Sequence, residues 1–347
     1  MHISDKPING YERVIIGVDQ SADYHGVIAI HSTVLGPAVG GTRFWNYPSD
    51  KEALTDALRL ARAMTYKNSL AGLPFGGGKS VILGNNKITQ REKVFRAHGR
   101  LIESLGGKYV AGEDVGTSPA DIEISALETR HVAGRLDLSG DPSPVTARGV
   151  FRAMQASAKY RWGSDDLSGR TVALQGCGHV GYYLAERLHK AGVNLVVSDV
   201  DSQKVATVVR EFGAKLVDPE KIYSAQADIF SPCALGGIIN DQTIPQLQVE
   251  MVVGGANNQL LEDRHGDALK KRNVLYAPDY AANAGGITNG AIELLGWDRE
   301  RVFTKVDNIY DTILRIYQIA EREGIPTYRA ADRLAEERLR LAQTAIP

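Results

Sequence analysis

Hydrophobic and polar positions in the first third of the chain alternate between strand-like runs and helical spacing. Two apolar runs, at 14–18 and 27–30, flank a polar segment and predict a pair of strands. Ser49 to Glu52 has the form of a capping box, and apolar residues follow it at three- and four-residue intervals. This pattern predicts a helix that ends near Lys67. The other elements predicted in this part are two strands, at 80–83 and 109–111, and a helix at 90–105.

Beyond residue 144 the apolar runs become short and alternate with helical stretches. Helices are predicted at 146–161 and 180–191, and strands at 171–174, 195–197, 229–230, 251–253 and 274–275. An amphipathic helix rich in Arg and Glu follows at 330–342. Strands that alternate with helices in this way are typical of a parallel, doubly wound sheet.

A change of composition between these two parts predicts a domain boundary. Gly, Asp, Ser and Pro accumulate between residues 134 and 144. We therefore expect an α/β fold of two domains. Residues 1–134 form an N-terminal α/β domain, which the C-terminal helix 330–347 joins, and residues 135–329 form the doubly wound domain.

Composition and charge exclude several classes of protein. The 347 residues are 43% hydrophobic and 23% charged, as in ordinary soluble globular proteins, and can fill two domains. A net charge of −1 argues against nucleic acid or a membrane as the main partner. We see no apolar run of transmembrane length and no signal peptide. The two cysteines have neither metal-ligand nor disulfide spacing, so we expect a cytoplasmic protein without a metal site.

The glycines of residues 176–181 carry the first chemical signal. Gly176, Gly178 and Gly181 follow a predicted strand directly and open a predicted helix. Asp199 lies at the end of the next strand, where an acidic side chain can accept a hydrogen bond from a ribose hydroxyl. This context predicts a Rossmann-type domain that binds NAD, because an acid at this place would repel the extra phosphate of NADP. The alternative is a glycine-rich turn that binds nothing.

Loops after later strands face the same crevice in this architecture. Ala234, with Leu235, could therefore pack near the nicotinamide. Asn257 and Asn258 follow another strand. A pair of amides there is equally consistent with a turn and with a polar contact to a ligand.

Two lysines and an aspartate in the first domain form a second candidate site. We expect Gly76–Gly78 to form a bare loop whose backbone can approach a small ligand. Partial burial and a second ammonium nearby would lower the pKa of Lys79 and make it usable as a base. A charged Lys67 suits a substrate carboxylate, and Asp114 could exchange protons, which together describe amino-acid or 2-oxo-acid chemistry. The alternative is that these are ordinary solvated charges.

Several motifs stand in a fixed order along nearly the whole chain. They are Leu35-Gly-Pro-Ala-Val-Gly-Gly-Thr-Arg43, Met64-Thr-Tyr-Lys67, Gly76-Gly-Gly-Lys79, Gly112-Glu-Asp-Val-Gly116, Pro144-Val-Thr146, Ala256-Asn-Asn-Gln-Leu260 and Tyr276-Ala-Pro-Asp-Tyr280. In these motifs the chain resembles the glutamate/leucine/phenylalanine/valine dehydrogenase family, and most closely its leucine dehydrogenases.

The resemblance implies NAD-dependent, reversible oxidative deamination of a hydrophobic L-amino acid to a 2-oxo acid and ammonia. It implies that the N-terminal domain holds substrate and catalytic groups and forms a homo-oligomer, a dimer or an octamer. On the family pattern Lys67 holds the substrate carboxylate, Lys79 activates water, and Asp114 exchanges protons with the amino group. Asn258 contacts the substrate, and Thr146 lies near the nicotinamide amide.

The same resemblance identifies the residues that select the substrate side chain. Val39, Gly112, Ile287 and Gly290 match pocket positions at which leucine dehydrogenases carry Leu, Ala, Val and Val, and Gly41 is also expected at the substrate. Three of these replacements remove volume and one adds some. We therefore expect activity on branched-chain amino acids with broad tolerance of bulky or aromatic ones.

Three alternatives remain beside this interpretation. The first is a dehydrogenase of the same family that prefers phenylalanine or another aromatic amino acid. The second is a glutamate dehydrogenase, which the short chain and the apolar pocket positions disfavour. The third is a non-catalytic sensor that binds NAD, which would not need Lys67, Lys79 and Asp114 together.

Overall fold

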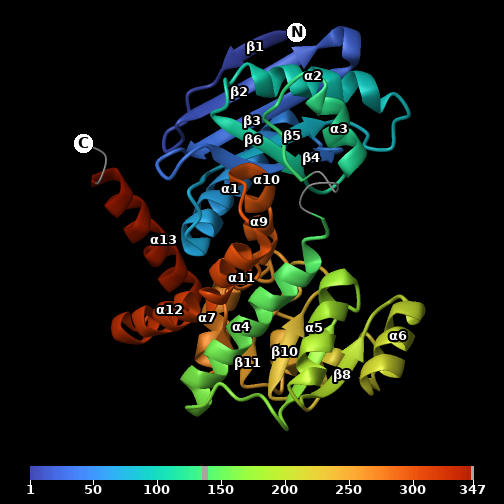
Figure 1. Ribbon diagram of the computed structural model, residues 1–347, viewed down its shortest axis with the longest axis vertical. Helices are drawn as coiled ribbons and strands as arrows, with labels where there is room; N and C mark the ends of the chain where they lie inside the picture. Colours follow the sequence, from blue (N-terminus) through green and yellow to red (C-terminus); the bar gives the residue numbers. More distant parts are fainter. Residues whose placement is uncertain (135–139, 345–347) are drawn as a thin grey trace. The chain divides into compact units, whose positions relative to one another are not determined.

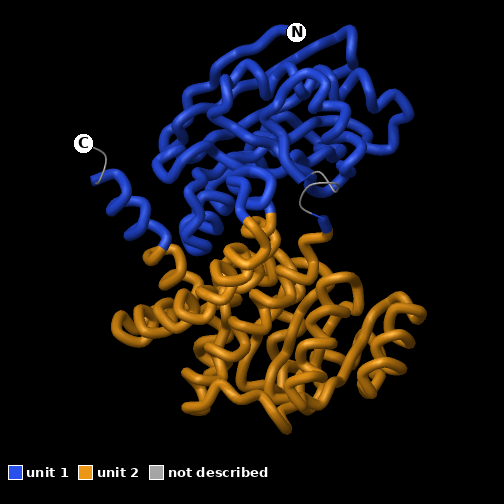
Figure 2. Tube along the Cα trace, viewed as in Figure 1, with its two compact units in different colours: residues 1–140, 290–297, 335–347 blue, residues 141–289, 298–334 orange. Residues whose placement is uncertain are grey.

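The chain forms two compact units (Figures 1 and 2). The computed structural model describes residues 1–134 and 140–344. The first unit contains residues 1–140, 290–297 and 335–347, and the second contains residues 141–289 and 298–334.

A mixed six-stranded sheet forms the centre of the first unit. Its strands stand in the order β1-β2-β3-β5-β4-β6. Their bounds are β1 (His2–Asp5), β2 (Arg13–Asp19), β3 (Tyr24–Ser32), β4 (Ala38–Trp45), β5 (Gly76–Leu83) and β6 (Tyr109–Glu113). The first three strands and β5 pair antiparallel, and β4 runs parallel to both β5 and β6.

Each face of this sheet packs on its own helices because successive side chains of a strand point to opposite sides. Helix α1 (Asp50–Ala71) covers one face, and helices α2 (Arg91–Glu103) and α3 (Pro119–Ala126) cover the other. Val27 and Val81 pack with Ala57 of α1, whereas the adjacent Ile28 and Ile82 belong to the core beneath α2. We call these the α1 face and the α2 face.

Helix α1 begins where its sequence predicts. The Ser49 side chain accepts a hydrogen bond from the backbone N–H of Glu52, which satisfies one of the free N–H groups of the first turn. The helix continues past Lys67 to Ala71 and ends at Gly72 in the left-handed conformation. Lys67 therefore lies one turn before the end of α1.

The prediction of a bare glycine loop before Lys79 is wrong, because Gly76–Gly78 are part of strand β5. A Cβ on Gly77 would lie 2.0 Å from the backbone nitrogen of Thr65, which belongs to α1. A Cβ on Gly76 would lie 1.9 Å from the carbonyl oxygen of Ser32. These glycines allow the strand to approach its neighbours in the core. Strand β4 is also absent from the sequence expectations, since its glycines interrupt the apolar alternation.

The second unit contains an all-parallel sheet, as predicted. Its strands stand in the order β12-β11-β10-β7-β8-β9. Their bounds are β7 (Thr171–Gln175), β8 (Asn194–Ser198), β9 (Lys215–Leu216), β10 (Ile229–Pro232), β11 (Met251–Val252) and β12 (Leu275–Tyr276). The chain enters at the central strand β7, runs outward to β9 and returns to β10, which is the doubly wound topology.

Helices connect these strands and complete both units. Those of the second unit are α4 (Ser143–Trp162), α5 (His179–Lys190), α6 (Ser202–Phe212), α7 (Asp263–Lys271), α8 (Asp279–Ala282), α9 (Gly285–Asn289), α11 (Arg299–Asp307) and α12 (Ile309–Glu323). Short 3₁₀ turns lie at η1 (Gln20–Ala22), η2 (Ile222–Ser224) and η3 (Ile244–Gln246). Helix α10 (Ala291–Leu295) belongs to the first unit.

The last helix, α13 (Thr327–Thr344), begins in the second unit and ends in the first. Its final part holds the end of α1. Arg338 donates hydrogen bonds to the carbonyl oxygens of Ser69 and Leu70, at 2.9 and 2.8 Å. A cation at the carboxyl end of a helix satisfies free carbonyls and complements the helix dipole. The segment of α1 that follows Lys67 is therefore fixed by the end of the chain.

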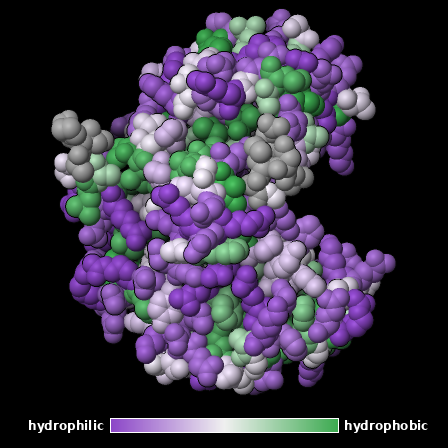
Figure 3. Space-filling view, viewed as in Figure 1, coloured by the Kyte–Doolittle hydropathy of each residue, from purple (hydrophilic) through white to green (hydrophobic). Residues whose placement is uncertain are grey.

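Hydrophilic side chains dominate the face that Figure 3 shows, with apolar residues in separate patches. Across residues 1–134 and 140–344, no helix has both the length and the apolar character needed to cross a membrane.

Gly77→Ala tests whether packing between α1 and β5 requires glycine. We expect the variant to lose about 3 kcal/mol of unfolding free energy or to fail to fold, because the added methyl would meet the backbone of Thr65. Thermal unfolding without added ligand measures the loss. Gly178→Ala is the matched control, since no atom lies within 4 Å of its added Cβ. Equal midpoints for both variants would contradict this account of the glycines.

Candidate active site

Lys79 and Asp114 meet on the α1 face of the first sheet. Lys79 is 4% exposed, and its Nζ lies 3.0 Å from Oδ1 of Asp114. Gly77, Lys79 and Val81 share one side of β5, and Asp114 follows β6 on the same side as Gly112. The two charged residues thus come from β5 and from the loop after β6, and these two strands lie on either side of β4.

Arg43 supplies a second cation to the same carboxylate. Its Nε donates a hydrogen bond of 2.8 Å to Oδ2 of Asp114, and its Nη1 donates one of 2.8 Å to Asp56 on α1. A Cβ on Gly41 would lie 2.8 Å from Cβ of Asp114, so glycine at position 41 makes room for the carboxylate. In the sequence, Arg43 stands out only as the last residue of a motif. The sequence offers no further signal for Arg43, because strand β4, which places it on the same side as Gly41, is not among the predicted elements.

Burial and neighbouring charges shift both pKa values of the pair. Burial on its own would raise the pKa of Asp114, but the charges of Lys79 and Arg43 outweigh it and hold that pKa below its ordinary value. Burial lowers the pKa of Lys79, the Asp114 carboxylate opposes this shift, and Arg43 reinforces it. The net result for Lys79 is a pKa below that of an ordinary lysine. An ionised carboxylate therefore lies beside an amine that loses its proton more readily than usual.

Hydrogen bonds of the Thr117 hydroxyl fix the loop that carries Asp114. The backbone N–H of Asp114 donates to Oγ1 of Thr117 at 2.9 Å. The hydroxyl of Thr117 in turn approaches the carbonyl oxygens of Thr42 and Asp114 at 3.0 and 2.9 Å. These bonds connect the loop to β4.

A neutral polar network lies on the opposite, α2 face. The ring of His98 contacts the hydroxyls of Tyr24 at 2.9 Å, Thr42 at 3.1 Å and Ser80 at 3.2 Å. Full burial lowers the pKa of His98 to about 3, so the ring is uncharged at neutral pH. Thr42 and Ser80 neighbour Arg43 and Lys79 in sequence, and the network fixes the strands that carry the two cations.

The other residues predicted for the substrate divide between the units. Val39, Gly41 and Gly112 lie on the same side of their strands as Lys79 and Asp114. Lys67 is half-buried on α1, and Gly290 precedes α10. The second unit contains the remaining two, Asn258 and Ile287, of which Ile287 is half-buried in α9.

The turn between β7 and α5 is tightly packed at two of its three motif glycines. Gly176 has a φ of +99°, and a Cβ there would lie 2.8 Å from the backbone nitrogen of Ala234. A Cβ on Gly181 would lie 1.9 Å from the carbonyl oxygen of Gly176. Gly178 differs, because a Cβ added there meets no atom within 4 Å. The residue that precedes α5 therefore borders open space.

Asp199 directly follows β8 and holds this turn with its carboxylate. One oxygen accepts a hydrogen bond of 2.6 Å from the backbone N–H of Cys177, and the other accepts one of 2.9 Å from Asp201. Burial, with Asp199 and Cys233 as smaller causes, raises the pKa of Cys177 to about 12. The Cys177 thiol therefore stays protonated and fills space.

The other residues predicted near the cofactor, and Asn258, which is predicted to contact the substrate, lie in loops and helix ends of the second unit. Ala234 is exposed. The Asn257 side chain accepts a hydrogen bond of 2.9 Å from Asn283. Asn258 has a φ of +51°, and its backbone N–H donates to Asp279 at 2.7 Å, so its conformation is that of a turn. Thr146 bonds the Pro142 carbonyl oxygen at 3.0 Å from the first turn of α4.

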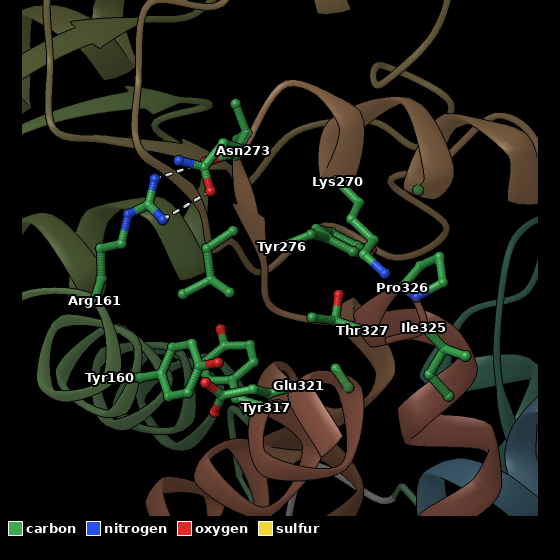
Figure 4. A pocket seen from close by; sticks show the side chains of 14 residues that line it. Tyr160, Arg161, Lys270, Asn273, Tyr276, Tyr317, Glu321, Ile325, Pro326 and Thr327 are labelled. Carbon is green, nitrogen blue, oxygen red and sulfur yellow. Dashed lines mark hydrogen bonds between the residues drawn. The ribbon is translucent and has the colours of Figure 1, made fainter. Parts of the chain in front are cut away.

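A separate cavity of about 210 Å³ lies in the second unit, and Figure 4 shows the side chains around it. Tyr160, Arg161, Asn273 and Tyr317 are among its lining residues. Asn273 precedes β12, so the cavity lies at the amino end of a strand. The glycine turn and Asp199 follow the carboxyl ends of parallel strands, at the opposite edge of the sheet. The cavity is therefore distinct from the dinucleotide turn.

Within the described ranges, no group of three or more His, Cys, Asp or Glu side chains could hold a metal ion. An ionised carboxylate beside a buried lysine, together with a glycine turn that suits a dinucleotide, defines the class of a dinucleotide-dependent dehydrogenase.

Comparisons with known proteins specify the family. A model of the Glu/Leu/Phe/Val dehydrogenase dimerisation domain matches residues 14–131, and a glutamate/leucine/phenylalanine/valine dehydrogenase model matches residues 139–203 and 195–345. The chain belongs to this family and is a leucine dehydrogenase-like amino-acid dehydrogenase.

Individual relatives match over nearly the full length. Leucine dehydrogenase of Geobacillus stearothermophilus is 53% identical over 96% of this chain and 92% of its own. Phenylalanine dehydrogenase of Thermoactinomyces intermedius is 45% identical over 95% of this chain and 92% of its own. The crystal structure of L-tryptophan dehydrogenase from Nostoc punctiforme has a TM-score of 0.89 at 45% identity, and 97% of each chain is covered.

A double-mutant cycle tests the energetic coupling of Lys79 and Asp114. Asp114→Asn should lower the unfolding free energy by about 3 kcal/mol, because it leaves a buried ammonium without its partner. Lys79→Met should then cost less in the Asp114→Asn background than alone. Chemical denaturation at neutral pH measures all four proteins.

The control for this cycle is the surface pair of Glu186 and Lys190, whose charged atoms lie 2.6 Å apart. Glu186→Gln should change stability by less than about 1 kcal/mol. If Lys79→Met costs the same in both backgrounds, the side chains of Lys79 and Asp114 act independently.

Proposed function

We propose that this chain catalyses the NAD-dependent, reversible oxidative deamination of a hydrophobic L-amino acid to its 2-oxo acid and ammonia. The observation that carries the proposal is the ion pair of buried Lys79 and half-buried Asp114, at 3.0 Å on one face of the first sheet. The reaction needs one group that takes a proton from the substrate amine and another that activates water, and these side chains have suitable chemistry.

Each residue has a stated role in the proposed reaction. Asp114, ionised beside two cations, takes a proton from the substrate amino group. Lys79, whose pKa is lowered by burial, takes a proton from the water that attacks the imine carbon. Lys67 holds the substrate carboxylate as a point charge. The roles of Asn258 and Thr146 stay predictions.

The chain's own turn supports NAD as the cofactor. Gly178 leaves open space at the N-terminus of α5, and Asp199 places a carboxylate after the next strand. In this proposal Gly176, Gly178 and Gly181 contact the pyrophosphate, and Asp199 disfavours the extra phosphate of NADP. When bound, NAD supplies the acceptor for the hydride that leaves the substrate Cα. Ala234 and Asn257 are proposed to line the nicotinamide end.

The name of the Geobacillus stearothermophilus relative, at 53% identity, favours a branched-chain substrate such as leucine. Val39, Gly41, Gly112, Ile287 and Gly290 are proposed to surround its side chain. The match to a dimerisation-domain model supports a homo-oligomer, a dimer or an octamer.

A preference for aromatic amino acids is the second candidate. The observation that favours it is the space at Gly112, where an added Cβ would meet only the Ala133 carbonyl oxygen, at 3.3 Å. The relatives named for tryptophan and phenylalanine, at 45% identity, are compatible with it. A non-catalytic sensor of NAD is the alternative from a different class.

Turnover with a panel of L-amino acids tests the proposed reaction. We expect NADH formation from NAD with hydrophobic amino acids, and much slower NADPH formation from NADP. Lys79→Ala should reduce kcat by about a hundredfold or more, because it removes the proposed base, while NADH binding measured by fluorescence is retained. Lys190→Ala, at an exposed surface pair, should leave the rate unchanged. A wild-type protein that binds NADH but oxidises no L-amino acid would overturn the proposal in favour of the sensor.

Gly112→Ala tests which side chain the site prefers. The added methyl would lie 3.3 Å from the Ala133 carbonyl oxygen, a contact that a small backbone shift relieves. We therefore expect a folded enzyme with a smaller substrate pocket. The ratio of kcat/KM for phenylalanine or tryptophan to that for leucine should fall by about tenfold. Steady-state kinetics with the three amino acids, together with an unchanged unfolding midpoint, measures the effect. An unchanged ratio would mean that Gly112 does not limit the substrate side chain.

A further inference from the structure

Arg43 joins the proposed catalytic pair to a second carboxylate on α1. Its Nε donates to Asp114 and its Nη1 donates to Asp56, both at 2.8 Å. The Tyr47 hydroxyl donates to the same oxygen of Asp56 at 2.6 Å, and Arg59 pairs with the other oxygen at 2.9 Å. Arg43 therefore has a partner on each side, and its position is determined from both.

The guanidinium group suits this place because its N–H groups point in fixed, separate directions. One of them fixes Oδ2 of Asp114, which leaves Oδ1 directed at Lys79. A lysine ammonium is a point charge without this planar fork. The side chains of Arg43 and Asp56 are each 17% exposed, so water screens their charges only weakly.

Arg43 differs from the other influences on the pair in the direction of its effect. Burial favours the neutral forms, which raises the pKa of Asp114 and lowers that of Lys79. The attraction between Lys79 and Asp114 favours the charged forms and has the opposite effect on each. The positive charge of Arg43 stabilises the Asp114 carboxylate and repels the Lys79 ammonium, so it lowers both pKa values. Both residues then lose their protons at lower pH.

We propose that Arg43, held by Asp56, is a positioning residue that orients Asp114 and biases both Asp114 and Lys79 toward their deprotonated forms. This inference rests on the proposed function, in which oxidation of the amino acid needs both groups without their protons. Asp56 tempers the bias, since its negative charge partly offsets the cation.

The acidic groups and the tyrosines near Asp114 do not reproduce this effect. Burial, and then the Asp114 charge, raise the pKa of Glu113 on β6. Burial raises the pKa of Tyr109 on the same strand, and that of Tyr47, which bonds Asp56. Helix α1 contributes Asp56 and also carries Lys67. Glu113 and Asp56 are anionic when ionised and the tyrosines stay neutral, so none of these four groups replaces the cation of Arg43.

Three substitutions distinguish an effect of Arg43 on the protonation of Asp114 and Lys79 from a merely structural role. In Arg43→Gln the rising limb of kcat/KM against pH should move to higher pH, and kcat/KM at neutral pH should fall by about tenfold or more. In Asp56→Asn, which keeps an acceptor oxygen, the limb should move to lower pH. Arg43→Lys keeps the charge and should hold the limb near its wild-type position. Arg59→Gln is the control, because it removes a cation that touches Asp56 but that is 55% exposed, and the limb should stay in place.

The ¹³C NMR signal of the Asp114 carboxyl group tests the proposal without a measurement of turnover. In protein labelled with ¹³C at the aspartate carboxyl groups, Asp114→Asn identifies the Asp114 resonance. That resonance should titrate at higher pH in Arg43→Gln than in the wild type. If Arg43→Gln does not fold, the opposite displacement in Asp56→Asn and the unmoved limb in Arg43→Lys decide the question.

The outcomes distinguish this proposal from the proposed function. An active wild type whose variants lose rate with no displacement of the limb would overturn the role of Arg43 and leave the proposed function intact. A wild type without turnover would overturn the proposed function, while the ¹³C titration would still decide whether Arg43 controls the Asp114 proton. Displacement of the limb in Arg59→Gln by as much as in Arg43→Gln would also overturn the proposal, because the effect would then come from any nearby cation.

Discussion

A buried ammonium 3.0 Å from a carboxylate imposes demands on the surrounding first unit. Charges that have left water cost free energy unless each keeps a close partner. Asp114 meets this condition with two cations, Lys79 on one oxygen and Arg43 on the other. Glycine at position 41 leaves the space that the carboxylate occupies, and Gly77 brings β5 against α1. The charged site thus requires glycine at positions 41 and 77, where a side chain would occupy the space of the carboxylate or separate β5 from α1.

The sheet of the first unit separates this charged site from a neutral one. Arg43 and Lys79 project toward α1, whereas the adjacent Thr42 and Ser80 contact His98 on the other face. Full burial keeps His98 uncharged, so the second network adds hydrogen bonds without adding a competing charge. Because side chains alternate along β4 and β5, each strand carries a charged residue of the candidate site on one face and a residue of the neutral hydrogen-bond network on the other.

The candidate site of the second unit depends on backbone N–H groups, whereas that of the first unit depends on charged side chains. Asp199 accepts hydrogen bonds from the N–H groups of Cys177 and Asp201, which fixes the turn between β7 and α5. Gly178 leaves open space at the beginning of α5. A diphosphate is recognised by N–H groups and a helix terminus, and a short stretch of chain can provide both. This explains why a local motif is sufficient to predict such a turn.

The sequence by itself determined the elements whose cause is local: the helix that begins at Ser49, the strand–turn–helix around Gly176, and the parallel sheet implied by alternating strands and helices. It did not reveal that Gly76–Gly78 form a strand, because the atoms that require glycine there belong to α1, β3 and β6. It also gave no reason to select Arg43, whose hydrogen-bond partner Asp114 lies 71 residues away. Only the tertiary structure decided these points, because the energy of a buried charge or of a close backbone approach depends on residues that are distant in sequence.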